Sequence, residues 1–327
     1  MDKVTKNTPK KQHYVPQFLL RNFSIEGKEQ LFTYDKQREI CFSASIRDSA
    51  SENGFYNITR SGDKLTFEHK LSKLETISSD VITKICDQET VEFLTDDEHQ
   101  ILCIFAASLL IRVKRQREFV SQLNSTIVDF VRRFGFEPNE IENFDELNCE
   151  QLDAQHVGFL STEILNIANK FGDKAVGLLK APDNHSFIIA DNPVVMFCHK
   201  PNRFMSKGVS VLGVEIYLPI SKQLCLSFLC MDFYHELVEK LEFIDANQNN
   251  FPELKEINVN YATKLVSSIQ SGKAEVIDDS SLNFINSIQI VDSFAYIYSD
   301  NNNFDQVKQI INKNPSIKSG NVVKIGI

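Results

Sequence analysis

Several residue types and motifs are missing from this 327-residue sequence, and each absence narrows the classes of protein to which it can belong. Trp is absent, so the 25 Phe residues and the aliphatic residues must supply most of the large side chains of a core. The seven Cys form no C-x-x-C pair and leave one without a partner. This pattern is typical of free thiols in a reducing compartment rather than of a secreted disulfide framework.

Long apolar runs are also lacking. The first dozen residues contain no hydrophobic segment of the kind found in a secretion signal, and no stretch reaches the ~18–20 apolar residues that a membrane span needs. The longest candidate, residues 101–113, contains Arg112 and is followed by Lys114 and Arg115. We therefore expect a cytoplasmic protein that does not cross a membrane.

Sequence motifs for the common cofactors are not found. There is no G-x-x-x-x-G-K-[ST], no G-x-G-x-x-G and no H-E-x-x-H, which argues against ATP-driven and nicotinamide chemistry. The histidines of the second half lack metal-ligand spacing, so a structural zinc site is not expected. The net charge of −9 argues against a protein that coats nucleic acid over its whole surface, although a local basic groove stays open.

What the sequence does contain predicts an α+β fold. Residues 1–12 form a basic tail without an apolar cluster, which we expect to be disordered. The remainder, residues 13–327, is expected to be one domain in three parts. Residues 13–95 hold an anchor helix, a short hairpin and a first long helix; residues 96–171 form a helical middle; residues 172–327 are rich in mostly antiparallel sheet.

The expected elements follow from hydrophobic periodicity. Thr95 and Glu98 form a capping box that starts a long helix, predicted to run without a break from Asp96 to about Phe134. Further helices are expected from residue 66 and at 149–170, 233–242, 253–271 and 304–312. Strands are expected at 30–35, 40–44, 54–58, 175–180, 186–190, 194–198, 215–218, 223–230, 288–291, 295–299 and 322–327. The first two of these strands should pair as a hairpin.

Polar side chains are set among apolar ones in residues 12–23, which we call the anchor. His13, Gln17 and Arg21 have the i, i+4, i+8 spacing of one helix face, although Pro16 interrupts regular helix before it. One interpretation is a row of ligand-facing groups. The alternative is structural, with Arg21 paired to a carboxylate and His13 capping a neighbouring element.

Charged side chains on the two following helices could complete a site. Glu68 and Glu75 are seven residues apart and share a helix face. They could be buried ion-pair partners for Arg112 or Arg115, or they could be acid/base groups. Basic residues gather between Arg112 and Arg133, which permits a phosphate-binding patch and a nucleic-acid partner. A solvated helix face explains the same charges.

A third candidate lies between two apolar strand segments, at Asp191-Asn192-Pro193. Asp and Asn bond readily to nearby backbone and Pro fixes φ, so a tight turn explains all three residues. Alternatively, Asp191 acts as a base or, together with Glu75, as a ligand of Mg²⁺ or Mn²⁺, with Asn192 binding substrate.

These motifs resemble a known family. The opening H-x-V-P-x-x-x-L-x-x-F at residues 13–23, the Asp-Asn-Pro, and stretches around Glu68–Glu75 and Arg112 resemble the bacterial domain-of-unknown-function family 4238, over roughly residues 11–230. Gln12 stands where that family often has a second His. The resemblance implies no activity.

Two function classes remain. The first is a hydrolase of a phosphate-containing substrate, in particular a metal-dependent nuclease, with His13, Glu68, Glu75 and Asp191 as catalytic groups. Gln17, Arg21, Arg112, Arg115 and Asn192 would then bind the substrate. The second is a non-catalytic binding or regulatory module whose polar network is structural. The enzyme hypothesis requires His13, Glu75, Arg112 and Asp191 to meet at one solvent-reachable cleft.

Overall fold

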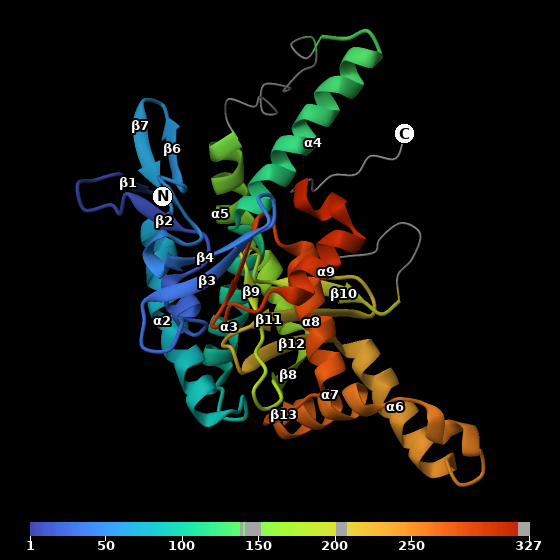
Figure 1. Cartoon of the computed structure of the whole chain (residues 1–327). Coiled ribbons are helices and arrows are strands. Elements are labelled where there is room, and N and C mark those ends of the chain that lie inside the picture. Colours follow the sequence, from blue (N-terminus) through green and yellow to red (C-terminus); the bar gives the residue numbers. More distant parts are fainter. Residues whose placement is uncertain (138–139, 141–151, 201–207, 320–327) are drawn as a thin grey trace.

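The computed structural model describes residues 1–137, 140, 152–200 and 208–319, and the arrangement of their elements is shown in Figure 1. The fold is mixed α and β with mostly antiparallel sheets, as the sequence predicts. Helices surround the sheets, and α4 projects from the body of the protein (Figure 1). Within the described residues, no helix has the length and apolar character needed to cross a membrane.

The first part of the chain consists of short strands and one short helix. They are β1 (Asp2–Lys3), β2 (Lys11–His13), α1 (Gln17–Arg21), β3 (Gln30–Asp35), β4 (Ile40–Ser45), η1 (Ile46–Asp48), β5 (Ser51–Asn53), β6 (Asn57–Arg60) and β7 (Asp63–Thr66). The hairpin of β3 and β4 forms as predicted. The tail differs from its prediction, because β1 pairs with β7 and β2 pairs with β5. Backbone pairing orders these polar residues without an apolar cluster of their own.

Four helices of the described chain follow: α2 (Glu68–Gln88), α3 (Asp96–Ile111), α4 (Lys114–Arg133) and α5 (Leu152–Gly172). The capping box predicted for Thr95 and Glu98 is present at the start of α3. The start predicted for the α5 helix, residues 149–151, lies outside the described residues.

The predicted single helix from Asp96 to Phe134 is wrong, because Val113 is extended and separates α3 from α4. Two carbonyls at the break are used elsewhere. His156 Nε2 donates to the carbonyl of Ile111 at 2.9 Å, and the Tyr56 hydroxyl donates to that of Arg112 at 3.2 Å. These tertiary bonds replace the intrahelical ones that would continue α3. No Pro or Gly marks this position, so the sequence pattern does not show it.

The second part of the chain builds a five-stranded sheet in the order β10-β11-β12-β8-β13. Its strands are β8 (Lys174–Lys180), β10 (Val195–Cys198), β11 (Val214–Pro219), β12 (Leu224–Cys230) and β13 (Ala274–Val276). All neighbours are antiparallel except β8 and β13. The helices α6 (Met231–Asn247) and α7 (Asn260–Ser271) pack against β8, and a turn of 3-10 helix, η5 (Pro252–Glu256), lies between them in the chain.

A separate four-stranded sheet, in the order β4-β3-β14-β9, joins the two ends of the chain. Strands β9 (Ile189–Ala190) and β14 (Tyr296–Ser299) come from the C-terminal part and extend the N-terminal hairpin. The remaining described elements are α8 (Asp279–Asp292), α9 (Asp305–Lys313) and η6 (Pro315–Ser319).

Three expected strands need comment. Residues 288–291 lie inside α8, so the strand prediction there is wrong; a short apolar run does not distinguish a strand from a buried helix. Residues 54–58 are mainly a turn between β5 and β6, where Gly54 has a φ of +64°. The strand expected at 322–327 lies outside the described residues.

Candidate functional site

A fully buried arginine connects the anchor to the helices. Arg112 follows α3 at the break before α4, and its side chain is 0% exposed. Its Nε donates to the carbonyl of Tyr14 at 3.1 Å, and its Nη2 donates to the carbonyl of His13 at 2.8 Å. Nη2 also pairs with Glu75 Oε1 of α2 at 2.5 Å. A buried guanidinium is tolerated only with such partners, so Arg112 fixes the main chain of the anchor against α2.

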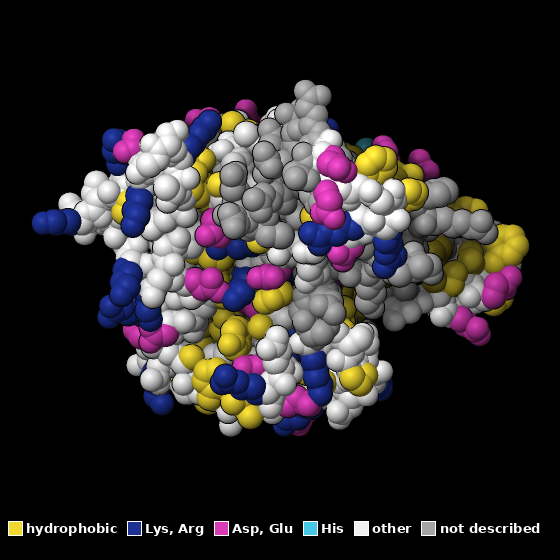
Figure 2. Space-filling model, turned by 90° about the horizontal axis from the view of Figure 1, so that it is seen from above, with side chains coloured by type: hydrophobic (Ala, Val, Ile, Leu, Met, Phe, Trp, Pro, Cys, Tyr) yellow, Lys and Arg dark blue, Asp and Glu magenta, His cyan; other side chains and the backbone are white. Residues whose placement is uncertain are grey.

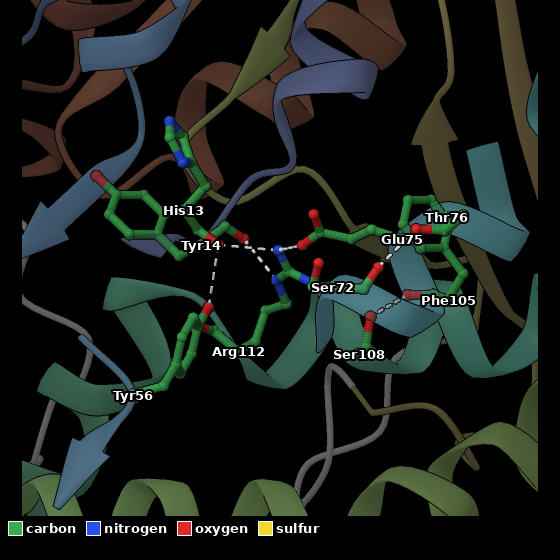
Figure 3. Close-up of polar contacts among 9 residues, drawn as sticks. All are labelled: His13, Tyr14, Tyr56, Ser72, Glu75, Thr76, Phe105, Ser108 and Arg112. Atoms are coloured by element: carbon green, nitrogen blue, oxygen red, sulfur yellow. Dashed lines mark hydrogen bonds and ion pairs between the residues drawn. The ribbon is translucent and has the colours of Figure 1, made fainter. Parts of the chain in front are cut away.

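Two further side chains hold the same strand. The Tyr56 hydroxyl lies 3.3 Å from the carbonyl of His13. Gln12, which is 0% exposed, accepts a bond from the Tyr56 N–H at 2.6 Å and donates to Asn57 at 3.0 Å. Figure 3 shows that the side chains of His13 and Tyr14 extend away from Arg112 while their main chain faces it. The network therefore holds the backbone of the anchor and leaves the side chains of positions 13 and 14 directed elsewhere.

The side chain of His13 lines an open pocket of about 510 Å³ between the anchor and α2, which we call the anchor pocket. Its wall contains all three members of the polar row predicted in the anchor, together with both predicted glutamates of α2. The lining residues are Pro9, Lys11, His13, Gln17, Phe18, Arg21, Glu68, Ser72, Glu75, Thr76, Ser79 and Asp80. His13 lies in β2, before Pro16, and is therefore outside α1. Its side chain nevertheless lines the same pocket as Gln17 and Arg21.

Two groups in this pocket have displaced pKa values. Burial raises the pKa of Glu68 to about 7; the neighbouring charge of Arg112 lowers it and that of Glu75 raises it further, both to a smaller extent. Burial also lowers the pKa of His13 below its usual 6.5, against the opposing effect of its bond to Arg47. Near neutral pH, Glu68 is therefore partly protonated while the imidazole of His13 is neutral.

The histidine has a defined orientation. Its Nε2 lies 3.1 Å from the carbonyl of Arg47 at the end of η1, and a carbonyl only accepts, so Nε2 carries the proton. The other ring nitrogen, Nδ1, is then the proton acceptor of the neutral ring. This bond is also the capping contact that the structural interpretation of His13 predicts. The position of His13 therefore fits both the ligand-facing and the structural interpretation.

Two substrate-binding candidates, Gln17 and Arg21, line the pocket, and Arg21 also makes the carboxylate pair that the structural interpretation predicts. Its Nε contacts both carboxylate oxygens of Glu29, at 3.1 and 3.2 Å, and its Nη2 lies 3.4 Å from Gln17 Oε1. The Arg21 and Glu29 side chains are 47% and 72% exposed. Ion pairs this exposed contribute little to stability, so an anionic ligand can replace Glu29 at small cost.

Asp191 does not join this pocket, so the predicted four-residue cleft is wrong for this residue. It is 1% exposed and accepts backbone N–H bonds from Phe294, Ala295 and Tyr296, at 2.7, 2.7 and 2.8 Å. Burial raises its pKa, and the three bonds and the charge of Lys36 oppose the shift. Both of its carboxylate oxygens are used, so Asp191 serves the corner between β9 and β14 and is not a free base.

The predicted metal pair of Glu75 and Asp191 does not form, because the two residues line different pockets. Nor does the described part of the chain contain any group of three His, Cys, Asp or Glu side chains arranged to hold a metal ion. Asn192 donates to the carbonyl of Asp292 at 3.1 Å and lines, with Arg115, a third pocket beside α4. These two predicted binding residues are therefore also apart from the anchor pocket.

Most of the basic residues between Arg112 and Arg133 lie within 4 Å of an acidic side chain. Lys114 pairs with Glu52 at 2.6 Å, and Arg117 pairs with Asp153 at 3.0 Å. Arg112 is buried and cannot contribute to a surface. On the face seen from above, Lys and Arg side chains are interspersed with Asp and Glu (Figure 2). A nucleic-acid contact of this helix stays a prediction.

A family model described as "Protein of unknown function (DUF4238)" matches residues 11–303. The chain belongs to this family. The match includes every residue that lines the anchor pocket except Pro9, so the pocket is part of the DUF4238 region. Comparisons with curated proteins and with solved structures find no match.

Some residues of the DUF4238 site are not apparent from the sequence. Tyr56 bonds to both the anchor and the carbonyl of Arg112, but an isolated Tyr in a turn carries no sequence signal. The sequence marks Gln12 only as a departure from the family's second His, whereas the structure shows that it is a buried hydrogen-bonding bridge. Ser72 and Ser79 line the pocket because they lie on the same face of α2 as Glu68 and Glu75.

Proposed function

We propose that the anchor pocket is the active site of a hydrolase that cleaves phosphodiester bonds of nucleic acid by general acid–base catalysis. The observation that carries this proposal is the placement of Glu68 and His13, from different elements, on one open pocket with their pKa values displaced in opposite directions. Pairs of titratable groups whose environments move their pKa values apart are typical of acid–base sites.

The residues have distinct roles in this proposal. His13 Nδ1 accepts a proton from the water whose oxygen attacks phosphorus, and Glu68 donates its proton to the oxygen that leaves. The products are a phosphate monoester and an alcohol. Arg21 binds the non-bridging phosphate oxygens after releasing Glu29. Arg112 does not line the pocket; it positions Glu75 and the His13 main chain.

A metal-dependent form of the hypothesis has less support, because the predicted ligands Glu75 and Asp191 lie in separate pockets. The acid–base form needs only the groups that do meet. Of the four residues that the enzyme hypothesis requires at one cleft, His13 and Glu75 line it, Arg112 lies behind it, and Asp191 is elsewhere. The requirement that all four residues meet at one cleft is therefore not met. The proposal is a narrower one, with His13 as the base, Glu68 as the acid, and Glu75 and Arg112 in supporting positions.

The test measures cleavage of fluorogenic RNA and DNA oligonucleotides, once with EDTA and once with Mg²⁺ or Mn²⁺. We expect His13→Gln and Glu68→Gln each to lower the rate at least ~100-fold, as for loss of a general acid or base. Thr76→Ala is the matched control, since Thr76 lines the pocket but its hydroxyl bonds only to the carbonyl of Ser72. Absence of cleavage under all conditions, or full activity of both variants, would refute the proposal.

A second candidate is a non-catalytic binding or regulatory module. It is favoured by the fact that the bonds of Arg112 and Gln12 go to the protein's own groups. This candidate predicts that Glu68→Gln and His13→Gln change no activity. Arg112→Ala does not separate the two hypotheses, because both of them require that residue for a stable fold.

A further inference from the structure

A second pocket lies beside the anchor pocket and shares no lining residue with it. We call it the aromatic pocket; its volume is about 460 Å³, within the usual range for small-molecule sites. One wall is a face of the four-stranded sheet. Tyr14 and residues 48–52 form another wall. The lining residues are Tyr14, Thr33, Gln37, Phe42, Ala44, Asp48, Ser49, Ala50, Ser51, Glu52, Lys114, Asp191, Phe294, Ala295, Tyr296 and Tyr298.

The strand register explains why aromatic rings gather there. Thr33 of β3 is directly opposite Phe42 of β4 and Tyr298 of β14, so these three side chains share one face of the sheet. Tyr296 lies two residues before Tyr298 and points to the same face. A planar ligand entering this space would meet ring faces and edges on more than one side.

One buried polar group in the pocket makes no hydrogen bond to any of the described residues. Thr33 Oγ1 is buried, on a side chain 2% exposed, and has no hydrogen-bond partner among the described residues. Buried hydroxyls are normally bonded, and an unbonded one opposes folding. Thr33 lines the pocket between two aromatic residues, so a ligand that displaces its neighbours slightly would reach this buried hydroxyl as a donor or acceptor.

The charges of the pocket restrict what the ligand can be. Lys114 is the cation among its lining residues, and it already pairs with Glu52 at 2.6 Å and lies 5.9 Å from the Phe294 ring centroid. Asp48 pairs with Lys11. A ligand with a carboxylate or phosphate would find no unpaired cation there, whereas an uncharged ring with donor and acceptor edges would suit Thr33 and the Gln37 amide.

The geometry points to the aromatic pocket as a binding site for an uncharged nucleoside, with its base stacked on the tyrosine and phenylalanine rings and its edge bonded to Thr33. Base stacking on aromatic side chains and hydrogen bonds to the base edge are the two interactions that recognise such ligands. The inference is independent of the proposed hydrolase, since no side chain serves both pockets.

Calorimetric titration of the full chain with adenosine, guanosine, cytidine and uridine tests this inference. We expect at least one to bind with a dissociation constant below about 1 mM, and its 5′-monophosphate to bind more weakly. Thr33→Val keeps the shape of the side chain and removes the unbonded hydroxyl. It should weaken binding by roughly 3- to 10-fold while the melting temperature stays the same or rises.

Further variants make the result specific. Tyr296→Ala should weaken binding by about 10-fold or more, through loss of stacking. Thr76→Ala, in the anchor pocket, should leave nucleoside binding unchanged. The inference is overturned if none of the four nucleosides binds, if Thr33→Val binds as tightly as the wild type, or if the monophosphate binds more tightly than the nucleoside.

Discussion

Arg112 shows how a single buried charge organises a site that it does not enter. Its guanidinium bonds to two main-chain carbonyls and one carboxylate, while its Nη1 is buried without a partner among the described residues. Burying an ion costs a large amount of solvation free energy, and its hydrogen bonds offset this cost only when all of its partners are in place. The consequence is that loss of the side chain should affect the fold before it affects any chemistry.

Arg112→Ala should lower the free energy of unfolding by about 3–5 kcal/mol, because it leaves two carbonyls and Glu75 without their buried partner. Urea denaturation monitored by circular dichroism measures the change. Arg115→Ala is the matched control: that side chain is 34% exposed and 3.9 Å from Asp292, so we expect less than about 1 kcal/mol. Equal effects of the two substitutions would contradict the assigned role of Arg112.

Glu68 makes stability depend on pH with a definite sign. Its pKa is about 7 in the folded state against 4.5 as the ordinary value, so the unfolded chain loses this proton first as pH rises. The contribution of Glu68 to stability therefore falls between about pH 4.5 and 7. Between pH 4.5 and pH 8, the free energy of unfolding of Glu68→Gln should rise by about 3 kcal/mol relative to that of the wild type, because a change of one in pKa corresponds to about 1.4 kcal/mol. Thermal denaturation at both pH values measures the difference. A pH-independent difference would show that Glu68 is ionised throughout.

Activity should follow the same two groups. The base form of His13 is lost as pH falls below its lowered pKa, under 6.5, and the acid form of Glu68 is lost as pH rises through about 7. The rate constant kcat/KM should accordingly be bell-shaped, with a maximum between those values. A profile that keeps rising above pH 8 would exclude Glu68 as the acid.

At the scale of elements, prediction succeeded where local chemistry decides the structure. Alternating residues define β3 with the same bounds that the pattern predicts, and the capping box places the start of α3. It failed where distant groups decide. The break after Ile111 depends on His156 and Tyr56, which are far away in sequence. In α8, the cap of Asp278 on the N–H of Ser281 is a local signal that the short apolar run 288–291 obscured.

The candidate site follows the same division. Gln17 and Arg21 share a face of α1, and Glu68 and Glu75 share a face of α2, as their spacing predicts. His13 reaches the same pocket from strand β2, so helical spacing does not account for its position. Asp191 does not join them, since its carboxylate accepts bonds from the backbone of residues 294–296, which are more than 100 positions away in the sequence. Nothing local distinguishes a turn aspartate from a site aspartate, so only the fold separates the two interpretations.

The corner between β9 and β14 can be tested through this aspartate. Asp191→Asn replaces one acceptor oxygen by an amide that faces backbone donors, so it should cost about 2 kcal/mol of unfolding free energy. Chemical denaturation gives the value. Asp183→Asn, at an exposed position, should change stability by less than about 0.5 kcal/mol. If both substitutions are silent, the carboxylate does not hold the corner.

At the scale of the whole molecule, the sheet order β4-β3-β14-β9 makes the early hairpin depend on the last part of the described chain. The main hydrophobic core likewise contains side chains from the anchor, such as Leu19 and Phe23, together with Phe228 of β12 and Tyr298 of β14. The parts expected at 13–95, 96–171 and 172–327 thus pack on shared residues rather than on separate cores.

A chain ending at Ser293 should therefore lose cooperative unfolding, because β3 loses its neighbour and Asp191 loses its backbone donors. Thermal denaturation followed by near-ultraviolet circular dichroism measures this loss. A chain ending at Lys313 retains β14 and α9 and should still unfold cooperatively. A cooperative transition in the shorter chain would show that the N-terminal hairpin is stable without β14.

The arginine clamp on the anchor acts on carbonyl oxygens, and every amino acid has one. Substitution of His13 removes its ring but leaves the carbonyl that Arg112 and Tyr56 contact. Substitution of Tyr14 likewise leaves the carbonyl that Arg112 contacts. Substitution at either position therefore leaves these backbone contacts in place, whereas the buried ring of Tyr14 also packs in the core against Phe55. The contacts that hold the anchor backbone are thus separate from the imidazole that lines the anchor pocket at position 13.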